Sequence, residues 1–437
     1  MTFRKIFTQH IAEADCHTLE FYQRNGGYKQ AREALNGQDP DDLIEQVKAA
    51  NLRGRGGAGF PTGVKWSFVP KSTDKPKYLV VNADESEPGT FKDRVIMEKN
   101  PHLLLEGILI CCKAVAIETA YIYIRGEFVF ATRRLQQAID EAYQAGIFGN
   151  DSLGSGLKID VTLHRGAGAY ICGEETGMLT SLEGDRGQPK LKPPFPAIEG
   201  AFGCPTVVNN VETLANLPYI LEIGAEAYRA IGPEKCPGPK LFCISGHVEN
   251  PGTFELPMGI PLRTLIDDHA GGVWKGRKLK AVIPGGSSAH VLTADECGVA
   301  MDIESLAAAG TMLGSAGIIV MDETTCMVDA LVNIMRFYHH ESCGQCTPCR
   351  EGTGWLEKIV HRIAHGEGRM EDLDLVLEVC DRMVGKTICA LADAAAFPAQ
   401  SIVTKFQDDF VAAIQNGGSP AWKRRHPSAV GGAASHG

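Results

Sequence analysis

Three cysteines lie close together in the last quarter of the sequence, at Cys343, Cys346 and Cys349. Two residues separate each from the next, a spacing that lets several thiolates reach one small inorganic centre. A zinc site would more often combine two separate cysteine pairs, or a pair with histidines. Three clustered thiolates joined by a distant fourth are typical of a [4Fe-4S] cluster, so the run predicts such a cluster, with zinc as the alternative.

The fourth ligand must come from another part of the chain, and two downstream cysteines are candidates. Cys380 falls on the apolar face of an expected helix and is interpreted as a core residue. Cys389 comes just after Gly385, where that helix is expected to stop, so its side chain is free to face a cluster. We therefore favour Cys389. A single cluster of this kind indicates electron relay, which requires a site where electrons enter.

A glycine-rich segment in the first part of the chain is a candidate for that site. Gly54, Gly56 and Gly59 match the spacing of the dinucleotide-binding fingerprint, but that fingerprint requires a preceding strand, and here we expect a helix. We therefore do not assign a standard Rossmann loop. Glycines still let backbone N–H groups approach a phosphate or a flat ring, so the segment predicts a binding loop, with an ordinary turn as the alternative.

Basic and aromatic residues accompany this segment. Arg55 and Lys65 could bring positive charge to a phosphate. Phe60 and Phe68 could stack on an adenine, since aromatic rings offer flat apolar faces. The alternative is that both phenylalanines belong to the core. A ligand with a phosphate and an adenine would explain all four residues together.

Carboxylates follow a strand expected at residues 77–82. Asp84, Glu85 and Glu87 come at its carboxyl end, the edge where open α/β sheets bind ligands. Their oxygens could accept hydrogen bonds from ribityl hydroxyls, ribose hydroxyls or a carboxamide. A solvated acidic loop is the alternative for this stretch.

A second glycine-rich loop follows the strand expected at residues 158–163 and ends at Gly173. Glu174 and Glu175 come next and begin a helix. General acid–base chemistry is one interpretation of the pair, and complementarity to the positive end of the helix dipole is the simpler one. Neighbouring residues on a helix do not face each other, so we do not expect a carboxylate dyad.

Two further segments could contact the same ligand. A loop rich in proline, glycine and lysine over residues 185–196 contains Lys192 and Phe195, which could form a wall over a ligand or simply belong to a surface loop. Asn209 or Asn210 is expected to cap a helix whose amino-terminal end could meet a phosphate.

The elements that must position these residues fall into successive blocks. Strands and helices alternate over the first half of the chain, which predicts an α/β domain with a mostly parallel sheet. A hairpin, a short helix and a strand between residues 241 and 283 predict a small ubiquitin-like β-grasp domain. From residue 324 the apolar residues recur at helical spacing, so the cysteine run is expected in a loop of a helical bundle. The predicted divisions are a helical segment with the glycine-rich loop at 1–62, the sheet domain at 63–236, the β-grasp domain at 237–323, the bundle at 324–418 and a tail at 419–437 that is either disordered or docks to a partner.

The overall composition limits the classes of function. The chain of 437 residues is 44% hydrophobic and 22% charged, as is usual for globular proteins of several domains. Its net charge of −10 argues against a nucleic-acid partner. Fourteen irregularly spaced cysteines do not resemble a secreted disulfide framework, and we expect neither a secretory signal nor direct membrane insertion. The most apolar stretch, residues 103–117, is interpreted as a buried helix.

Five of these features occur in one order along nearly the whole chain: the loop at 53–60, the acids at 82–89, the turn at 173–175, the segment at 208–213 and the cysteine run. Together they closely resemble the flavin subunit of respiratory complex I, the NADH-oxidising subunit of bacterial NADH:quinone oxidoreductase. The resemblance implies a Rossmann-like domain for FMN and NADH, then a ubiquitin-like SLBB domain, and then a helical domain with the [4Fe-4S] cluster.

The resemblance also implies particular binding residues. FMN and the nucleotide would be held by residues of the glycine-rich segment, the two acidic loops and the segment after the last strand: Gly54, Arg55, Gly56, Gly57, Gly59, Lys65, Asn82, Asp84, Glu85, Gly173, Glu174, Val208, Asn209, Asn210 and Thr213. The adenine would lie among Phe60, Phe68 and Phe195. Glu87 and Glu175, as the candidate catalytic residues, and Lys192 would contact the rest of the nucleotide. The cluster ligands implied are Cys343, Cys346, Cys349 and Cys389.

The function implied is electron input: NADH gives a hydride to FMN, and single electrons then pass to the cluster and through partner subunits toward quinone. The flavin subunits of NAD-linked formate dehydrogenases and soluble hydrogenases are similar and remain an alternative, as does a non-catalytic iron–sulfur assembly module. Because the sequence has no second cysteine run, we expect a separate [2Fe-2S] subunit of the E type, beside the large iron–sulfur subunit of the G type. The expected location is cytoplasmic, peripheral on the inner membrane through these partners.

Overall fold

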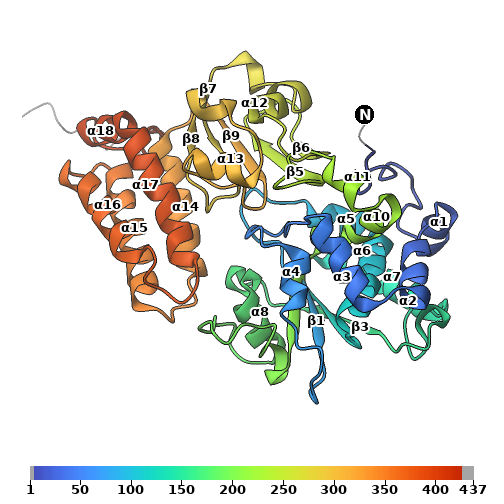
Figure 1. Ribbon diagram of the computed structural model, residues 1–437. Helices are drawn as coiled ribbons and strands as arrows, with labels where there is room; N and C mark the ends of the chain where they lie inside the picture. Colours follow the sequence, from blue (N-terminus) through green and yellow to red (C-terminus); the bar gives the residue numbers. More distant parts are fainter. Residues whose placement is uncertain (1–3, 426–437) are drawn as a thin grey trace, which may run out of the picture.

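The computed structural model describes residues 4–425 and contains two β-sheets with helices around them (Figure 1). The first sheet has four strands in the order β3-β2-β1-β4, and every neighbouring pair is parallel. Its strands are β1 (Tyr78–Ala83), β2 (Thr119–Ile124), β3 (Asp160–Arg165) and β4 (Thr206–Asn210). This confirms the predicted parallel sheet. Because parallel strands share one carboxyl edge, the register sets Asn82 of β1 opposite Asn210 of β4.

Most helices of this domain cover one face of the sheet. They are α1 (Leu19–Arg24), α2 (Lys29–Gly37), α3 (Pro40–Ala49), α4 (Thr62–Ser67), α5 (Asp93–Lys99), α6 (Pro101–Val115), α7 (Val129–Gln144), α9 (Val211–Ala215), α10 (Leu217–Ile223) and α11 (Ala225–Arg229). The expected buried helix is α6, whose side chains are buried along almost its whole length. Alternate strand residues point to opposite faces, so Leu79 and Val81 pack with these helices.

The other face of the sheet packs against a second core. Val80, Tyr123 and Val208 belong to it, together with α8 (Glu175–Leu182) and the carboxyl-terminal helices. The apolar interior therefore runs without a break from the sheet to the helical bundle. This continuity fixes the position of the bundle relative to the carboxyl edge of the strands.

The second sheet has five strands in the order β6-β5-β9-β7-β8. They are β5 (Pro239–Gly246), β6 (Gly252–Pro257), β7 (Leu279–Ile283), β8 (Leu292–Thr293) and β9 (Gly317–Asp322), with the short helices α12 (Leu262–Thr264) and α13 (Ile303–Ala308). The antiparallel hairpin of β5 and β6 agrees with the sequence prediction. The sequence did not indicate β9, which enters the centre of the sheet and pairs with both β5 and β7.

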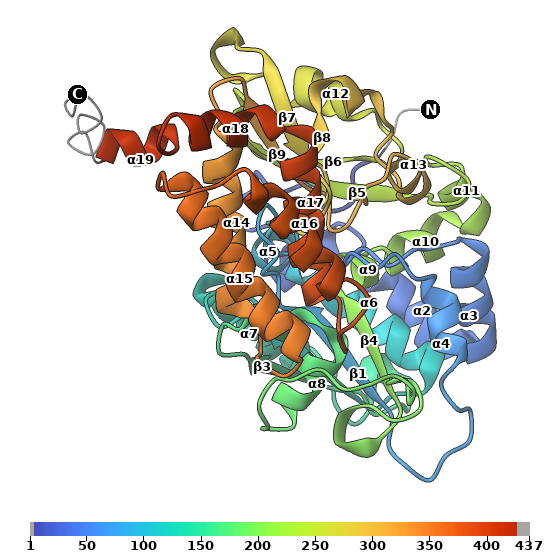
Figure 2. The same ribbon diagram turned by 90° about the vertical axis from the view of Figure 1, so that its left-hand side faces the viewer.

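The remaining helices form a bundle beside both sheets (Figure 1 and Figure 2). They are α14 (Met327–Glu341), α15 (Thr347–Ala364), α16 (Glu371–Met383), α17 (Leu391–Lys405), α18 (Gln407–Gln415) and α19 (Pro420–Arg425). Cys343 lies in the connection of α14 and α15, as predicted, whereas Cys346 is the N-cap of α15 and Cys349 belongs to its first turn. The predicted tail begins with α19, and its part from residue 426 lies outside the described residues. Between residues 4 and 425, no helix has both the length and the apolarity needed to cross a bilayer.

Candidate functional site

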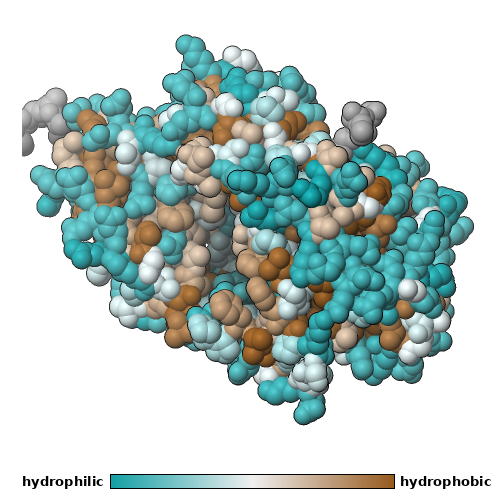
Figure 3. Space-filling view, viewed as in Figure 1, coloured by the Kyte–Doolittle hydropathy of each residue, from teal (hydrophilic) through white to brown (hydrophobic). Residues whose placement is uncertain are grey.

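A cleft of about 400 Å³ opens where the parallel sheet, the second sheet and the bundle meet. Figure 3 shows the surface hollowed between the bundle and the α/β domain. Its walls come from the glycine-rich segment, the loop after β1, the turn before α8 and the start of α17. The predicted site residues that line it are Gly56, Gly57, Asn82, Asp84, Glu85, Glu87, Gly173, Glu174, Asn210 and Cys389. Residues more than three hundred positions apart thus meet in one cleft.

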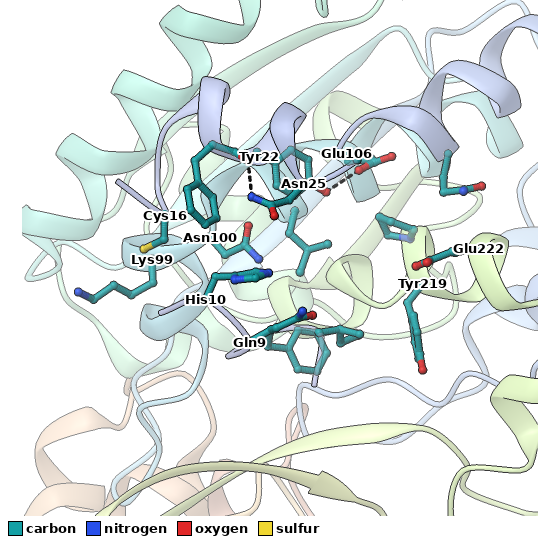
Figure 4. A pocket seen from close by; sticks show the side chains of 18 of the residues that line it. Gln9, His10, Cys16, Tyr22, Asn25, Lys99, Asn100, Glu106, Tyr219 and Glu222 are labelled. Carbon is teal, nitrogen blue, oxygen red and sulfur yellow. Dashed lines mark hydrogen bonds between the residues drawn. The ribbon is translucent and has the colours of Figure 1, made fainter. Parts of the chain in front are cut away.

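A second cavity, of about 250 Å³, lies between the amino-terminal segment and helices α6 and α10 (Figure 4). Its buried carboxylate, Glu106, already accepts hydrogen bonds from the Tyr22 hydroxyl and from the backbone N–H groups of Tyr28 and Ala31. Its wall contains none of the predicted site residues. The cleft where the two sheets and the bundle meet is therefore the candidate functional site.

The glycine-rich segment forms a tight loop between α3 and α4, and its amino-terminal side is a helix, as predicted. The Gly54 N–H donates to the Phe60 carbonyl at 2.9 Å, which closes the loop. At Gly56 an added Cβ would lie 3.0 Å from Cβ of Asn210, so the loop packs tightly against the end of β4. Gly57 has φ near +132°, which favours glycine. Backbone N–H groups can approach a ligand closely here.

Arg55 points away from the cleft. Its guanidinium donates to the Pro237 carbonyl at 2.6 Å and to the Tyr228 hydroxyl at 3.2 Å, while its backbone N–H donates to Thr213 Oγ1 at 2.8 Å. The side chain is buried and ties the loop to the connection between the two sheets. Any contact of Arg55 with a ligand in the cleft would therefore come from its backbone.

The carboxyl-terminal part of β4 anchors the neighbouring helices. Lys65 Nζ donates to the Val208 carbonyl at 3.2 Å, and Trp66 Nε1 donates to Asn209 Oδ1 at 2.9 Å. Asn210 caps α9, as expected of one of the two asparagines, because its Oδ1 accepts from the Glu212 N–H. These contacts hold the carboxyl end of β4 against α4.

Asp84 is the carboxylate of the cleft that has an unused oxygen. Its Oδ2 is buried and has no hydrogen-bond partner among residues 4–425. Burial raises the pKa of Asp84 to about 7. Beside it, Asn82 Nδ2 donates to the Gly173 carbonyl at 2.8 Å and joins the two predicted loops. An orphaned acceptor in a cleft fits a ligand that carries hydroxyl groups, as the ribityl chain of FMN does.

The other carboxylates of these loops are already engaged. Glu85 accepts from the N–H groups of Lys92 and Asp93 at 2.8 Å each, at the start of α5, and burial raises its pKa to about 7. Glu174 caps α8 by accepting from the Thr176 and Gly177 N–H groups, as the helix-start interpretation expects. These two carboxylates shape the cleft by fixing the helices that surround it.

Glu87 joins three parts of the molecule. Its carboxylate accepts from the Tyr170 hydroxyl at 2.6 Å and from the N–H and hydroxyl of Ser288 at 2.8 and 2.7 Å. The neighbouring Ser287 hydroxyl contacts the Tyr338 hydroxyl of α14 at 2.9 Å. Glu87 thus holds together the loop after β1, the 3₁₀ helix before α8 and the loop after β7, and Ser287 extends this contact to α14 of the bundle.

Glu175 faces the loop at 185–196 rather than Glu174. Lys192 Nζ lies 2.8 Å from its Oε1, and Lys65 Nζ lies 3.7 Å from its Oε2. Burial alone would raise the pKa of Glu175, but these two ammonium groups outweigh burial and lower it. Lys192 Nζ also lies 3.5 Å from Glu174 Oε1, so the two acids share this ammonium group and do not contact each other as a carboxylate dyad.

The phenylalanines lie on the surface and not in the core. Phe60, Phe68 and Phe195 are 43%, 53% and 56% exposed. The rings of Phe60 and Phe68 lie next to each other, with centroids 6.1 Å apart. Exposed aromatic side chains of this size are suited to stacking on a flat ligand.

A buried charge cluster beneath the cleft was missed by sequence reasoning. Glu212 Oε2 lies 2.9 Å from Lys92 Nζ and 2.6 Å from Lys240 Nζ, and Lys92 also pairs with Asp93 at 2.7 Å. Burial would raise the pKa of Glu212, but the ammonium groups of Lys240 and Lys92 outweigh it and lower the pKa to about 2. The sequence did contain one sign of this cluster, because Lys240 is a charged residue within the otherwise apolar strand β5.

The four predicted ligand thiols line one small cavity next to the cleft. Cys343, Cys346, Cys349 and Cys389 share its wall with Ile171 and Leu391. Cys380 is fully buried in the core, as predicted. Among residues 4–425 no three His, Cys, Asp or Glu side chains converge closely enough for a single metal ion. A [4Fe-4S] cluster does not need its ligands to converge on one point, because each thiolate binds a different iron at its own corner of the cubane. The four thiols line the same cavity, so they fit such a cluster by number and position.

Burial also affects these thiols. It raises the pKa of Cys389 to about 11 and raises that of Cys349, because an isolated thiolate is poorly solvated there. Cluster ligands are thiolates, so the positive charge of the irons must compensate for this burial.

Comparison with known proteins gives a consistent result. Residues 47–219 match the Nuo51 FMN-binding domain, residues 240–320 the SLBB domain, and residues 329–413 the NADH-ubiquinone oxidoreductase-F iron-sulfur binding region. The chain is 56% identical to the NADH-quinone oxidoreductase F subunit numbered 2 of Rhizobium meliloti, over 94% of this chain and 98% of that one. It is 50% identical to the NADH-quinone oxidoreductase F subunit of Mycobacterium tuberculosis, over 95% and 94%.

A solved structure is also similar. The crystal structure of an NAD⁺-reducing [NiFe]-hydrogenase in the H₂-reduced state matches with a TM-score of 0.82 and 33% identity, over 94% of this chain and 67% of that one. The flavin-domain and cluster-domain matches fall on the segments that form the cleft and the thiol cavity.

Proposed function

Because the chain belongs to the family of NADH-quinone oxidoreductase F subunits, we propose that it is the electron-input subunit of such an enzyme. When bound, FMN accepts a hydride from NADH and releases the electrons singly to the [4Fe-4S] cluster. One observation carries the proposal: the cleft that contains the glycine-rich and acidic loops also has Cys389, the proposed fourth cluster ligand, in its wall. A flavin in this cleft would lie beside the cluster.

The residues of the chain supply binding and orientation. The loop around Gly56 and Gly57 lets the backbone approach the flavin, and Asp84 would accept a hydrogen bond from a ribityl hydroxyl through its unpaired Oδ2. Asn82 and Gly173, which are hydrogen-bonded to each other, keep both loops in place. The buried ion pairs around Glu212 form the rigid floor beneath.

The nucleotide would bind toward the exposed side of the cleft. Phe60, Phe68 and Phe195 would contact the adenine. Glu175 and Lys192, which form an ion pair with each other in this structure, would separate and contact the ribose or the phosphates instead. Hydride transfer between NADH and a flavin requires no protein acid or base. The role proposed for Glu87 and Glu175 is therefore to position the nucleotide and control its release.

The runner-up is the flavin subunit of an NAD-linked hydrogenase, which the similar crystal structure supports. The F subunits are closer in sequence, at 50–56% against 32–33% identity, and match this chain over nearly their full length. We therefore propose as partners a [2Fe-2S] subunit of the E type and a large iron–sulfur subunit of the G type. The complex would lie on the cytoplasmic side of the inner membrane.

The visible spectrum of the purified chain tests the function directly. We expect flavin absorption together with broad iron–sulfur absorption, and bleaching of both when NADH is added. Iron–sulfur absorption without flavin would instead support a non-catalytic assembly module. Reduction by H₂ in the native complex in place of quinone-linked NADH oxidation would support the hydrogenase alternative.

A further inference from the structure

The cleft and the thiol cavity have a common wall made by three residues: Ile171, Cys389 and Leu391 line both. Ile171 belongs to the short 3₁₀ helix of residues Tyr170–Gly173, which ends the second glycine-rich loop. Leu391 is the first residue of α17, two positions after Cys389. Among the four thiols only Cys389 reaches the cleft side.

Two of the three residues of this wall are apolar and buried. Ile171 and Leu391 are 6% and 5% exposed, and both belong to the apolar core that continues from the sheet into the bundle. On the cleft side, the lining continues along α17 with Asp393, Ala394 and Phe397, so it includes a carboxylate, and the apolar part of the partition itself is confined to Ile171 and Leu391. Neither Ile171 nor Leu391 has a polar side-chain atom that could hold water at the partition.

Hydrogen bonds fix both sides of the wall. The Tyr170 N–H donates to Glu341 Oε2 at 2.9 Å, which ties the residue before Ile171 to the end of α14. On the other side, the Gly385 N–H donates to Asp393 Oδ1 at 2.9 Å, which ties the loop before Cys389 to the first turn of α17. The two apolar side chains are therefore held at the junction from opposite directions.

We propose that Ile171 and Leu391 are positioning residues that exclude water from the cluster and hold Cys389 at the edge of the cleft. The proposal rests on the proposed function, since it assumes FMN in the cleft and a cluster on the four thiols. Solvent exposure changes both the potential and the chemical stability of an iron–sulfur cluster. Removing either side chain would join the two cavities and admit water to the cluster, whereas the flavin contacts made by the two glycine-rich loops would remain.

The test uses the full chain loaded with FMN and cluster, with Ile171→Ala and Leu391→Ala as wall variants. Ile359→Ala and Leu373→Ala are matched controls, because these residues belong to the same core, are 6% and 4% exposed, and line neither cavity. The rate at which EDTA in air bleaches the cluster absorption is measured, together with the cluster midpoint potential by EPR-monitored titration. Flavin content is measured in each sample.

We expect the wall variants to bleach about tenfold faster than the unaltered chain and the controls to stay within about twofold, with rates compared between samples of equal measured flavin content. The cluster potential should shift in the wall variants alone, and Ile171→Val should lie between Ile171→Ala and the unaltered chain. Equal bleaching and equal potentials in wall variants and controls would overturn the proposal. Missing flavin or cluster absorption in the unaltered chain would instead contradict the proposed function, and the inference with it.

Discussion

The cleft and the thiol cavity are neighbours, but they reach their structures by different means. The walls of the cleft are held by the protein's own bonds: Glu85 and Glu174 cap helices, and Glu87 joins three segments. The thiol cavity holds four cysteines, and burial raises the pKa of Cys349 and Cys389, so these thiols would become thiolates only when the positive charge of a bound cluster compensates for that burial. The difference implies that the cleft can form before its ligand binds, whereas the cluster region depends on its metal.

The largest effect is expected for the thiol cavity. Cys343→Ala should abolish the iron–sulfur absorption and all cluster-dependent electron output, because a cubane would lose one of its four ligands. NADH should still reduce the flavin in the cleft. Visible spectra and rapid-mixing absorbance measure both results. Cys380→Ala is the control, since that thiol is a buried core residue, and normal cluster-dependent activity in Cys343→Ala would refute the ligand set.

The next largest effect concerns the floor of the cleft. Glu212→Gln leaves the buried Lys92 and Lys240 without their shared carboxylate and should lower the free energy of unfolding by about 3–5 kcal/mol. Urea unfolding of the chain without added FMN measures this. Glu222→Gln is the control, because its ion pair with Arg4 is exposed and should contribute about 0–1 kcal/mol. A change of the same size in both variants would mean that the cleft is not held by its buried charges.

The same carboxylate predicts a dependence on acid. The folded-state pKa of Glu212, about 2, lies below its ordinary value of 4.5, so its contribution is present above pH 4.5 and is lost as the pH falls toward 2. The unaltered chain should therefore lose more stability over this range than Glu212→Gln does. If the free energy of unfolding fell equally steeply with pH in the two proteins, Glu212 would not be a buried ionised carboxylate.

Asp84, whose Oδ2 has no partner among the described residues, has a pH dependence of the opposite sign. Its folded-state pKa of about 7 lies above the ordinary 3.8, so the unfolded chain releases the proton first, and stability falls as the pH rises from about 4 to about 7. Asp84→Asn should remove the contribution of Asp84 to this fall, on the order of a few kcal/mol, in urea unfolding at pH 5 and pH 8 without FMN, while Glu85, whose pKa is also raised to about 7, keeps its own contribution. Added FMN should protect the unaltered chain more than the variant. An unchanged pH slope in Asp84→Asn would show that Asp84 is not the group concerned.

The smallest effect is expected at the exposed side of the cleft. Glu175→Gln weakens a partly exposed ion pair with Lys192, so the Michaelis constant for NADH should change only about threefold, with FMN content intact. Steady-state kinetics with ferricyanide and flavin extraction measure the two quantities. If the variant lost its FMN and kept its nucleotide affinity, the division of the cleft into a flavin floor and a nucleotide side would be wrong.

The sequence alone was sufficient for features that depend on local spacing. Strand and helix periodicity predicted the parallel sheet, the hairpin of β5 and β6 and the helical bundle, all of which the structure contains. The two-residue gaps among three cysteines predicted the shared thiol cavity, and the apolar helix face distinguished Cys380 from Cys389. Such patterns are encoded within a few turns of chain, where neighbouring residues decide the outcome.

Only the tertiary structure decided where individual side chains point. It turned Arg55 away from the cleft, engaged Glu85 in capping a helix, and paired Glu212 with Lys92 and Lys240. It also brought Ile171 and Leu391, which lie 220 residues apart in sequence, to one partition. These outcomes depend on how distant segments pack, and the free energy of burying a charge or an apolar side chain depends on partners that no local pattern identifies.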